Sequence, residues 1–111
     1  MMRIGFSSLV CPEWDLETIV YKASTLGFDG VELHGLQGSL HLPLVPEMAA
    51  DPGRVRRVFQ ERGVKLVCLG ASVGVDARGR GQVARQKETV VEFIELAAKL
   101  DCPYVRLYLR C

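Results

Sequence analysis

Hydrophobic and polar positions near the start of the chain predict one strand followed by one helix. Arg3–Ser7 is a short β-prone run. Asp15 is a good helix N-cap, and Gly27 suits the left-handed position that ends a helix. Between them, apolar residues recur at helical spacing: Leu16, Ile19, Val20, Ala23 and Leu26. We therefore predict a strand over Arg3–Ser7 and a helix of about three turns that begins after Asp15.

A second β/α unit follows. Gly30–His34 alternates apolar and polar residues, which predicts a strand whose two faces meet different surroundings. Gly35–Ala50 is predicted to be a long loop. After it, Asp51 as N-cap and Pro52 at the first helical position open a helix that stops at Gly63.

The last two strands enclose the longest helix. Lys65–Leu69 is predicted as the third strand, and Gly70–Gly81 as a glycine-rich loop. From about Gln82 to Leu100 one face is apolar at helical period, and Tyr104–Leu109 after Pro103 forms the fourth strand. The order β-α-β-α-β-α-β, with four parallel strands and three helices, requires right-handed crossovers.

Charged residues inside two strands favour a closed barrel over an open, doubly wound α/β sheet. In the open sheet helices cover both faces, so Glu32 and Arg106 would be buried charges. In a barrel they point to the interior, where alternate strands contribute to the same layer. We predict that they form a partly buried ion pair or share a substrate, with His34 and Tyr108 nearer the C-terminal mouth.

A complete barrel of this kind has eight strands and about 250 residues. The 111 residues here provide four strands. The predicted fold class is therefore an incomplete (β/α)8 TIM barrel, in which residues 1–111 form the N-terminal part.

Composition and charge make several partners and compartments less plausible. With 14 basic and 13 acidic residues the net charge is +1, too small to attract nucleic acid or an anionic membrane at long range. No apolar run approaches the roughly 18 residues of a membrane span, and the start lacks the apolar core of a signal peptide. The four cysteines have no metal-ligand spacing and suit reduced thiols. We expect a cytoplasmic protein that binds neither nucleic acid nor membrane.

Two runs of residues carry a family resemblance. Ser7–Glu17 and Leu26–Leu33 closely resemble sugar phosphate isomerase/epimerase proteins of the xylose-isomerase-like TIM barrel superfamily. The likeness continues through Cys68–Ser72 and Pro103–Leu107, and so covers essentially the whole chain. It implies isomerisation or epimerisation of a small sugar, sugar phosphate, polyol or keto-acid derivative. It also implies a divalent metal (Mn, Mg, Zn or Co) bound by residues of later strands, so no metal ligand is assigned in this chain.

Matched positions imply substrate-binding residues. These are Glu32 and His34 on the second strand, Ser72 after the third, and Arg106 on the fourth. Tyr108 is a fifth candidate, because it lies further along the fourth strand, towards the C-terminal mouth. Glu32 and His34 are also candidates for acid/base catalysis, because isomerisation moves a proton next to a carbonyl. Relatives often have Arg where this chain has His34, which leaves the preferred substrate charge open.

Three further residues have a secondary place among the candidates. His41, between two leucines, suits packing better than substrate contact. Arg78 and Arg80 could clamp a phosphate or carboxylate by bidentate hydrogen bonds, although loop arginines are more often simply solvated. The glycines near them match neither a dinucleotide fingerprint nor a P-loop, so no nucleotide cofactor is expected.

Two other functions remain open. The chain could be a non-catalytic remnant or assembly module that closes its sheet against a second copy, as a homodimer, or against a missing C-terminal half. An apurinic-site endonuclease of the same superfamily is disfavoured, because such an enzyme uses several histidines and a basic DNA surface, whereas this chain has 2 histidines.

Overall fold

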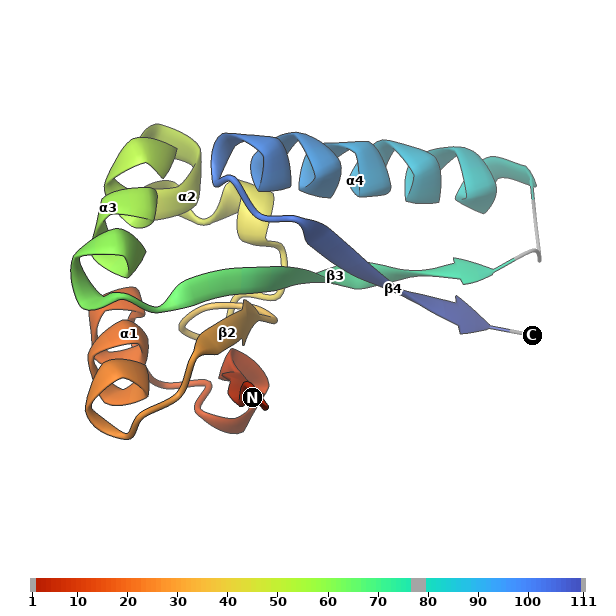
Figure 1. Cartoon of the computed structure of the whole chain (residues 1–111). Coiled ribbons are helices and arrows are strands. Elements are labelled where there is room, and N and C mark those ends of the chain that lie inside the picture. Colours follow the sequence, from red (N-terminus) through yellow and green to blue (C-terminus); the bar gives the residue numbers. More distant parts are fainter. Residues whose placement is uncertain (1, 77–79, 111) are drawn as a thin grey trace.

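A computed structural model of the chain describes residues 2–76 and 80–110, with side chains described for 2–71 and 84–107. Strands and helices alternate along it, and two short 3-10 helices follow the first two strands (Figure 1). In chain order the elements are β1 (Gly5–Ser7), η1 (Ser8–Val10), α1 (Leu16–Thr25), β2 (Gly30–Leu33), η2 (Leu42–Leu44), α2 (Pro46–Ala50), α3 (Pro52–Arg62), β3 (Lys65–Asp76), α4 (Arg80–Lys99) and β4 (Tyr104–Arg110).

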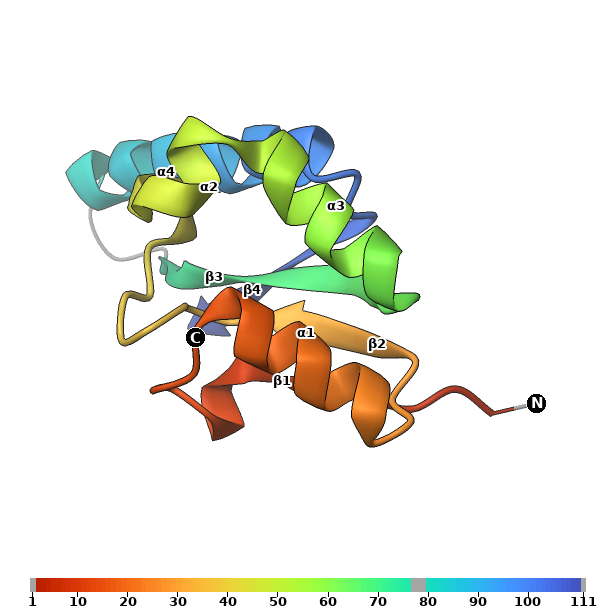
Figure 2. The same ribbon diagram turned by 90° about the vertical axis from the view of Figure 1, so that its left-hand side faces the viewer.

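The four strands form one sheet in the order β1-β2-β3-β4, and every neighbouring pair is parallel. Since spatial order equals chain order, the sheet has no reversal point of the kind that defines a doubly wound fold. In Figure 2, α3 and α4 lie above β3, and α1 lies beside the first two strands. The chain is thus a partial (β/α)8 barrel, as predicted.

The predicted caps explain where the first and third helices start. The Thr18 backbone N–H donates to Asp15 Oδ1 over 2.8 Å, and the Arg54 N–H donates to Asp51 Oδ1 over 3.0 Å. Gly63 ends α3 in the left-handed region at φ 67°, which glycine adopts without a Cβ penalty. These local signals were sufficient to predict both helix boundaries.

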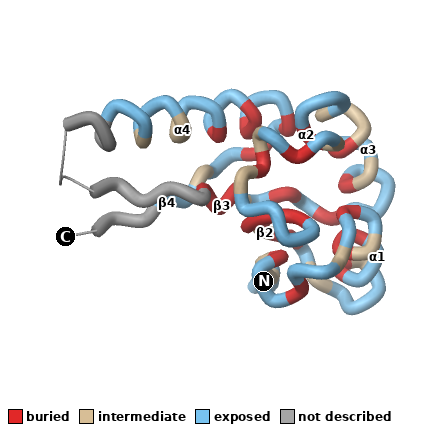
Figure 3. The backbone as a smooth tube through the Cα atoms, turned by 180° about the vertical axis from the view of Figure 1, so that it is seen from behind, coloured by how far each residue is buried: buried red, intermediate tan, exposed pale blue. Residues whose placement is uncertain are grey.

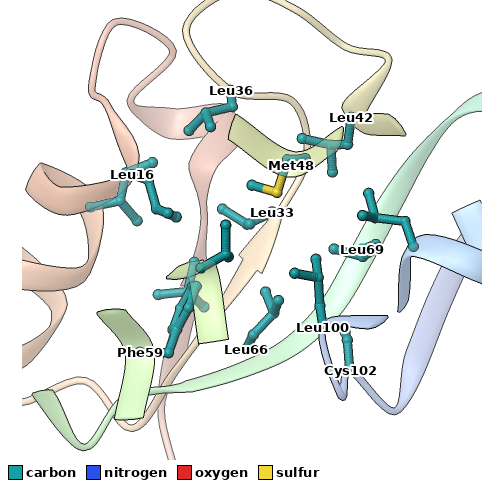
Figure 4. Close-up of a cluster of buried hydrophobic side chains, with 14 of the residues drawn as sticks. Leu16, Leu33, Leu36, Leu42, Met48, Phe59, Leu66, Leu69, Leu100 and Cys102 are labelled. Atoms are coloured by element: carbon teal, nitrogen blue, oxygen red, sulfur yellow. The ribbon is translucent and has the colours of Figure 1, made fainter. Parts of the chain in front are cut away.

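The hydrophobic core lies between the sheet and its helices. Figure 3 shows buried positions along β2 and β3, and Figure 4 shows leucines from the sheet meeting side chains of the covering helices. Phe93 from α4 and Leu16 from α1 are among the largest fully buried side chains. Burial of this apolar face holds the helices against the sheet.

The predicted loop over Gly35–Ala50 is wrong in its second half. There η2 and α2 fold, so the described part of the chain has four α-helices where three were predicted. Pro46 starts α2 at its first turn, and Leu42 and Met48 are fully buried. The segment becomes ordered because these two side chains complete the core.

The predicted glycine-rich loop over Gly70–Gly81 is also wrong in part. β3 continues to Asp76, and after a register shift Gly74–Asp76 pairs with Tyr108–Arg110 of β4. α4 begins at Arg80, so that residue belongs to a helix. Pairing with β4 satisfies the backbone of this stretch, which outweighs the low strand propensity of its glycines.

Candidate functional site

Strand register brings polar residues into one row on the face of the sheet that the helices leave open. Ser7 of β1 lies opposite Glu32 of β2, and Glu32 lies opposite Cys68 of β3. Val31 pairs with Leu66 but Glu32 pairs with Cys68, so β3 carries one extra residue, Val67, at this point. This bulge places the thiol, and not the side chain of Val67, beside the carboxylate.

Glu32 and Arg106 form the ion pair that their alternating positions predicted. Arg106 Nε donates to Glu32 Oε2 over 2.7 Å, and Arg106 Nη2 donates to Glu32 Oε1 over 2.9 Å. The Glu32 side chain is 19% exposed and that of Arg106 is 42% exposed. This is a bidentate pair, at the strong end of charge-assisted hydrogen bonds.

The environment of Glu32 keeps its carboxylate ionised. Its hydrogen bonds with Arg106 lower its pKa most; partial burial opposes them, and a hydrogen bond from Ser7 lowers the pKa further. A general acid or base works best when its pKa lies near the working pH. Glu32 is therefore better suited to hold Arg106 than to exchange protons with a substrate.

His34 directly follows β2 and is only 7% exposed. Its backbone N–H donates to Ser8 Oγ over 2.8 Å, and the Ser8 hydroxyl donates to the Gly35 carbonyl over 2.9 Å. Ser8, itself 3% exposed, thus fixes the end of β2. We did not predict this role. The available signal was a small hydroxyl residue immediately after β1, where barrel enzymes place polar groups.

The imidazole of His34 lies between Arg106 and the backbone of Gly70. Its Nδ1 is 3.1 Å from Arg106 Nη2. A Cβ added at Gly70 would lie 2.3 Å from the same Nδ1, closer than any real contact. The absence of a side chain at Gly70 therefore makes room for the ring, and Glu32, Arg106 and His34 form one connected cluster.

The remaining candidates from the sequence are placed only in part. Ser72 lies within β3, whereas it was predicted to follow the strand, and Tyr108 lies in β4 opposite Gly74. The side chains of Ser72, Tyr108 and Arg80 lie outside the described residues, and Arg78 lies outside them altogether.

His41 connects the segment after β2 to the longest helix. Its Nε2 is 2.9 Å from Glu92 Oε2, and its ring meets the edge of Phe93 with centroids 5.5 Å apart. Both partners belong to α4. The packing role predicted for His41 agrees with its contact to Phe93, whereas its hydrogen bond with Glu92 was not foreseen.

The cysteine at the site is a poor nucleophile. Burial, followed by the nearby Glu32 carboxylate, raises the pKa of Cys68 to about 11. Burial also raises the pKa of Cys11 and Cys102, and all three thiols are free. Since the thiolate is the reactive form, Cys68 acts here as a small, weakly polar neighbour of Glu32.

A broad cavity of about 1010 Å³ opens beside this row of polar residues, towards the N-terminal ends of the strands. Its lining includes Ser7, Glu32, Val67 and Cys68. A cavity of this size is large enough for a small molecule.

The residues of this site do not fit a complete metal-ligand set. Among the described side chains, no three His, Cys, Asp or Glu residues are grouped to hold a metal ion. Both oxygens of Glu32 already bind Arg106.

No helix in the described part of the chain is long and apolar enough to cross a membrane.

Comparison with known proteins adds evidence about the fold. Neither the protein-family models nor the curated protein sequences contain a match to this chain. Among solved structures, it is similar to the probable 3-DHS dehydratase AsbF, involved in petrobactin synthesis, from Bacillus anthracis. The TM-score is 0.73 at 15% sequence identity, over 96% of this chain and 38% of AsbF. The chain thus has the fold of just over a third of that protein.

Proposed function

We propose that this chain forms one wall of the substrate site in a barrel isomerase or epimerase, as the N-terminal part of that barrel. The substrate would be a small sugar, sugar phosphate, polyol or keto-acid derivative. The observation that carries the proposal is the cluster of Glu32, Arg106 and His34 on the open face of the sheet. Substrate sites of barrel enzymes are built where strands end, and His34 directly follows β2.

Each residue of the cluster has a separate task in this proposal. His34 and Arg106 hydrogen-bond to oxygen atoms of the substrate, and Glu32 holds Arg106 in place through its two hydrogen bonds. Ser72 and Tyr108, which the family resemblance and the sequence pattern make candidates, would contact the same substrate. The family resemblance also implies a divalent metal, which would supply Lewis-acid chemistry. Its ligands would come from other strands, because the cluster here is already paired internally.

Binding and turnover test this proposal with one matched pair of variants. Wild type, Glu32→Gln and Glu17→Gln are titrated with aldoses, ketoses, their phosphates, polyols and keto acids. Glu17 also pairs with an arginine, Arg54, but on the helical surface, so it controls for the loss of one carboxylate. We expect one compound class to bind wild type and Glu17→Gln, and to bind Glu32→Gln at least about tenfold more weakly, the equivalent of one charge-assisted hydrogen bond.

Turnover is measured on the polypeptide of the complete open reading frame, with and without Mn²⁺ or Mg²⁺. Interconversion of the compound that binds would support the proposal. If no compound binds, or if Glu32→Gln binds as well as Glu17→Gln, the cluster is not a substrate site.

The second candidate function is an assembly module, favoured by the open cavity and by the two edge strands, β1 and β4. Unpaired strand edges readily pair with another chain. Analytical ultracentrifugation of the 111-residue chain distinguishes the candidates. Concentration-dependent dimerisation without binding of any compound would favour assembly, whereas a monomer that binds a sugar would favour the enzyme.

A further inference from the structure

One terminal nitrogen of Arg106 contacts two different groups. Arg106 Nη2 lies 2.9 Å from Glu32 Oε1 and 3.1 Å from His34 Nδ1. This nitrogen carries two hydrogens, so it can donate to both. The carboxylate also accepts from Arg106 Nε over 2.7 Å, which fixes the plane of the guanidinium. One N–H of Nη2 is thereby directed to Glu32, and the other is available to the ring of His34.

A guanidinium has only hydrogen-bond donors and does not lose its proton in proteins. The contact with His34 Nδ1 is therefore attractive only if that ring nitrogen presents a lone pair. In the doubly protonated imidazolium, and in the tautomer with its proton on Nδ1, a donor would face a donor. The geometry thus selects the neutral ring with its proton on Nε2.

Two independent contacts hold the ring in this position. The ring of His34 occupies the space that a side chain at residue 70 would need, since a Cβ added at Gly70 would lie 2.3 Å from Nδ1. Ser8 fixes the backbone of His34 through the N–H that donates to its hydroxyl over 2.8 Å. The ring is therefore placed at Arg106 by its backbone hydrogen bond to Ser8 and by the space that Gly70 leaves for it.

We infer that Arg106 is a positioning residue that holds His34 in the Nε2–H tautomer, so that His34 cannot serve in the substrate site as a general base. Nδ1 is engaged by Arg106, and Nε2 carries a proton, so the ring has no lone pair to offer a substrate proton. The tautomer stands without any substrate, whereas its use in the site rests on the proposed function.

Nitrogen-15 NMR of the ligand-free chain tests the tautomer directly. The chain has 2 histidines, so the long-range ¹H–¹⁵N spectrum contains few ring signals, and His41→Gln assigns them. At about pH 8, above the usual imidazole range, we expect His34 to be protonated almost entirely at Nε2. Protonation of Nδ1, or an even mixture of tautomers, in wild type would overturn the inference.

Three variants show whether Arg106 is the cause. Arg106→Met removes the donor and should convert His34 to a mixture of both tautomers. Arg54→Met removes an arginine from a surface ion pair and should leave the His34 signals unchanged. Gly70→Ala keeps Arg106 but displaces the ring, and should also give the mixture. If His34 stays purely Nε2–H in folded Arg106→Met, Arg106 does not set the tautomer.

The outcomes separate this inference from the proposed function. If Arg106→Met fails to fold, as judged from its amide spectrum, the spectra of wild type and Gly70→Ala test whether His34 is held in the Nε2–H tautomer. A pure Nε2–H tautomer together with no sugar binding would uphold the positioning role and reject the substrate site. Sugar binding together with a proton on Nδ1 would support the substrate site and reject the positioning role of Arg106.

Discussion

Replacing both members of the Glu32–Arg106 pair should reveal a coupling free energy that a surface pair lacks. Exposed ion pairs contribute roughly 0.2–1 kcal/mol, and breaking a fully buried pair costs about 3–5 kcal/mol. Glu32 is 19% exposed and Arg106 is 42% exposed, so this pair lies between those limits. With its two hydrogen bonds, we expect a coupling of about 1–2 kcal/mol.

The assay is a double-mutant cycle in urea at pH 7. Glu32→Gln and Arg106→Met are measured singly and together, and the cycle isolates the pair from other effects of each change. The matched cycle uses Glu17→Gln and Arg54→Met, whose side chains are 63% and 43% exposed. There we expect at most about 0.5 kcal/mol. Equal coupling in the two cycles would refute the idea that the interior position strengthens the pair.

Acid should weaken the same pair. Arg106 lowers the pKa of Glu32 in the folded state below its usual 4.5, so the unfolded chain binds more protons as the pH falls. The stabilisation is complete above pH 4.5 and is lost as the pH passes through the folded value. The difference in unfolding free energy between wild type and Glu32→Gln should therefore shrink below pH 4.5. A difference that stays constant down to about pH 3 would contradict this sign, because an unperturbed Glu would be mostly protonated there.

Three further perturbations test the core, a helix cap and the thiol beside the site. Phe93→Ala removes a fully buried side chain and should cost about 3–5 kcal/mol in urea unfolding, whereas a loss below about 1 kcal/mol would show that this part of the core is not packed as described. Asp15→Ala removes the cap of α1 and should cost about 1 kcal/mol, and Asp15→Asn should restore most of it, since Asn caps equally well. Cys68, with a pKa of about 11, should react with iodoacetamide at pH 8 more slowly than it does in the urea-unfolded chain, and equal rates would contradict its burial beside Glu32.

Much of the fold could be predicted because its signals are local. Asp15 and Asp51 start their helices with side-chain caps, and Gly63 ends one in the left-handed region. Alternation within Gly30–His34 predicted a strand with one polar face, and the structure pairs that face with Arg106. Such signals depend on a residue and its near neighbours, so the sequence contains them.

The elements that were missed depend on distant contacts. α2 has only five residues, and its order comes from burial of Met48, which a local pattern does not show. The second half of β3 is rich in glycine and is a strand because β4 pairs with it. In both cases the tertiary environment overrides a weak local preference.

The candidate site divides in the same way. The alternation of polar residues on the second and fourth strands predicted that Glu32 and Arg106 face the same layer, as an ion pair or around a shared substrate, and the structure joins them as an ion pair. That Cys68 lies beside Glu32, and that the ring of His34 lies over Gly70, follows from strand register, including the shift on β3 at Val67. The alternation of side chains between the two faces of a strand is visible in a sequence, whereas a shift of register between strands is not. The charges of this site could therefore be predicted from the sequence, but the contacts that give His34 its chemical role required the structure.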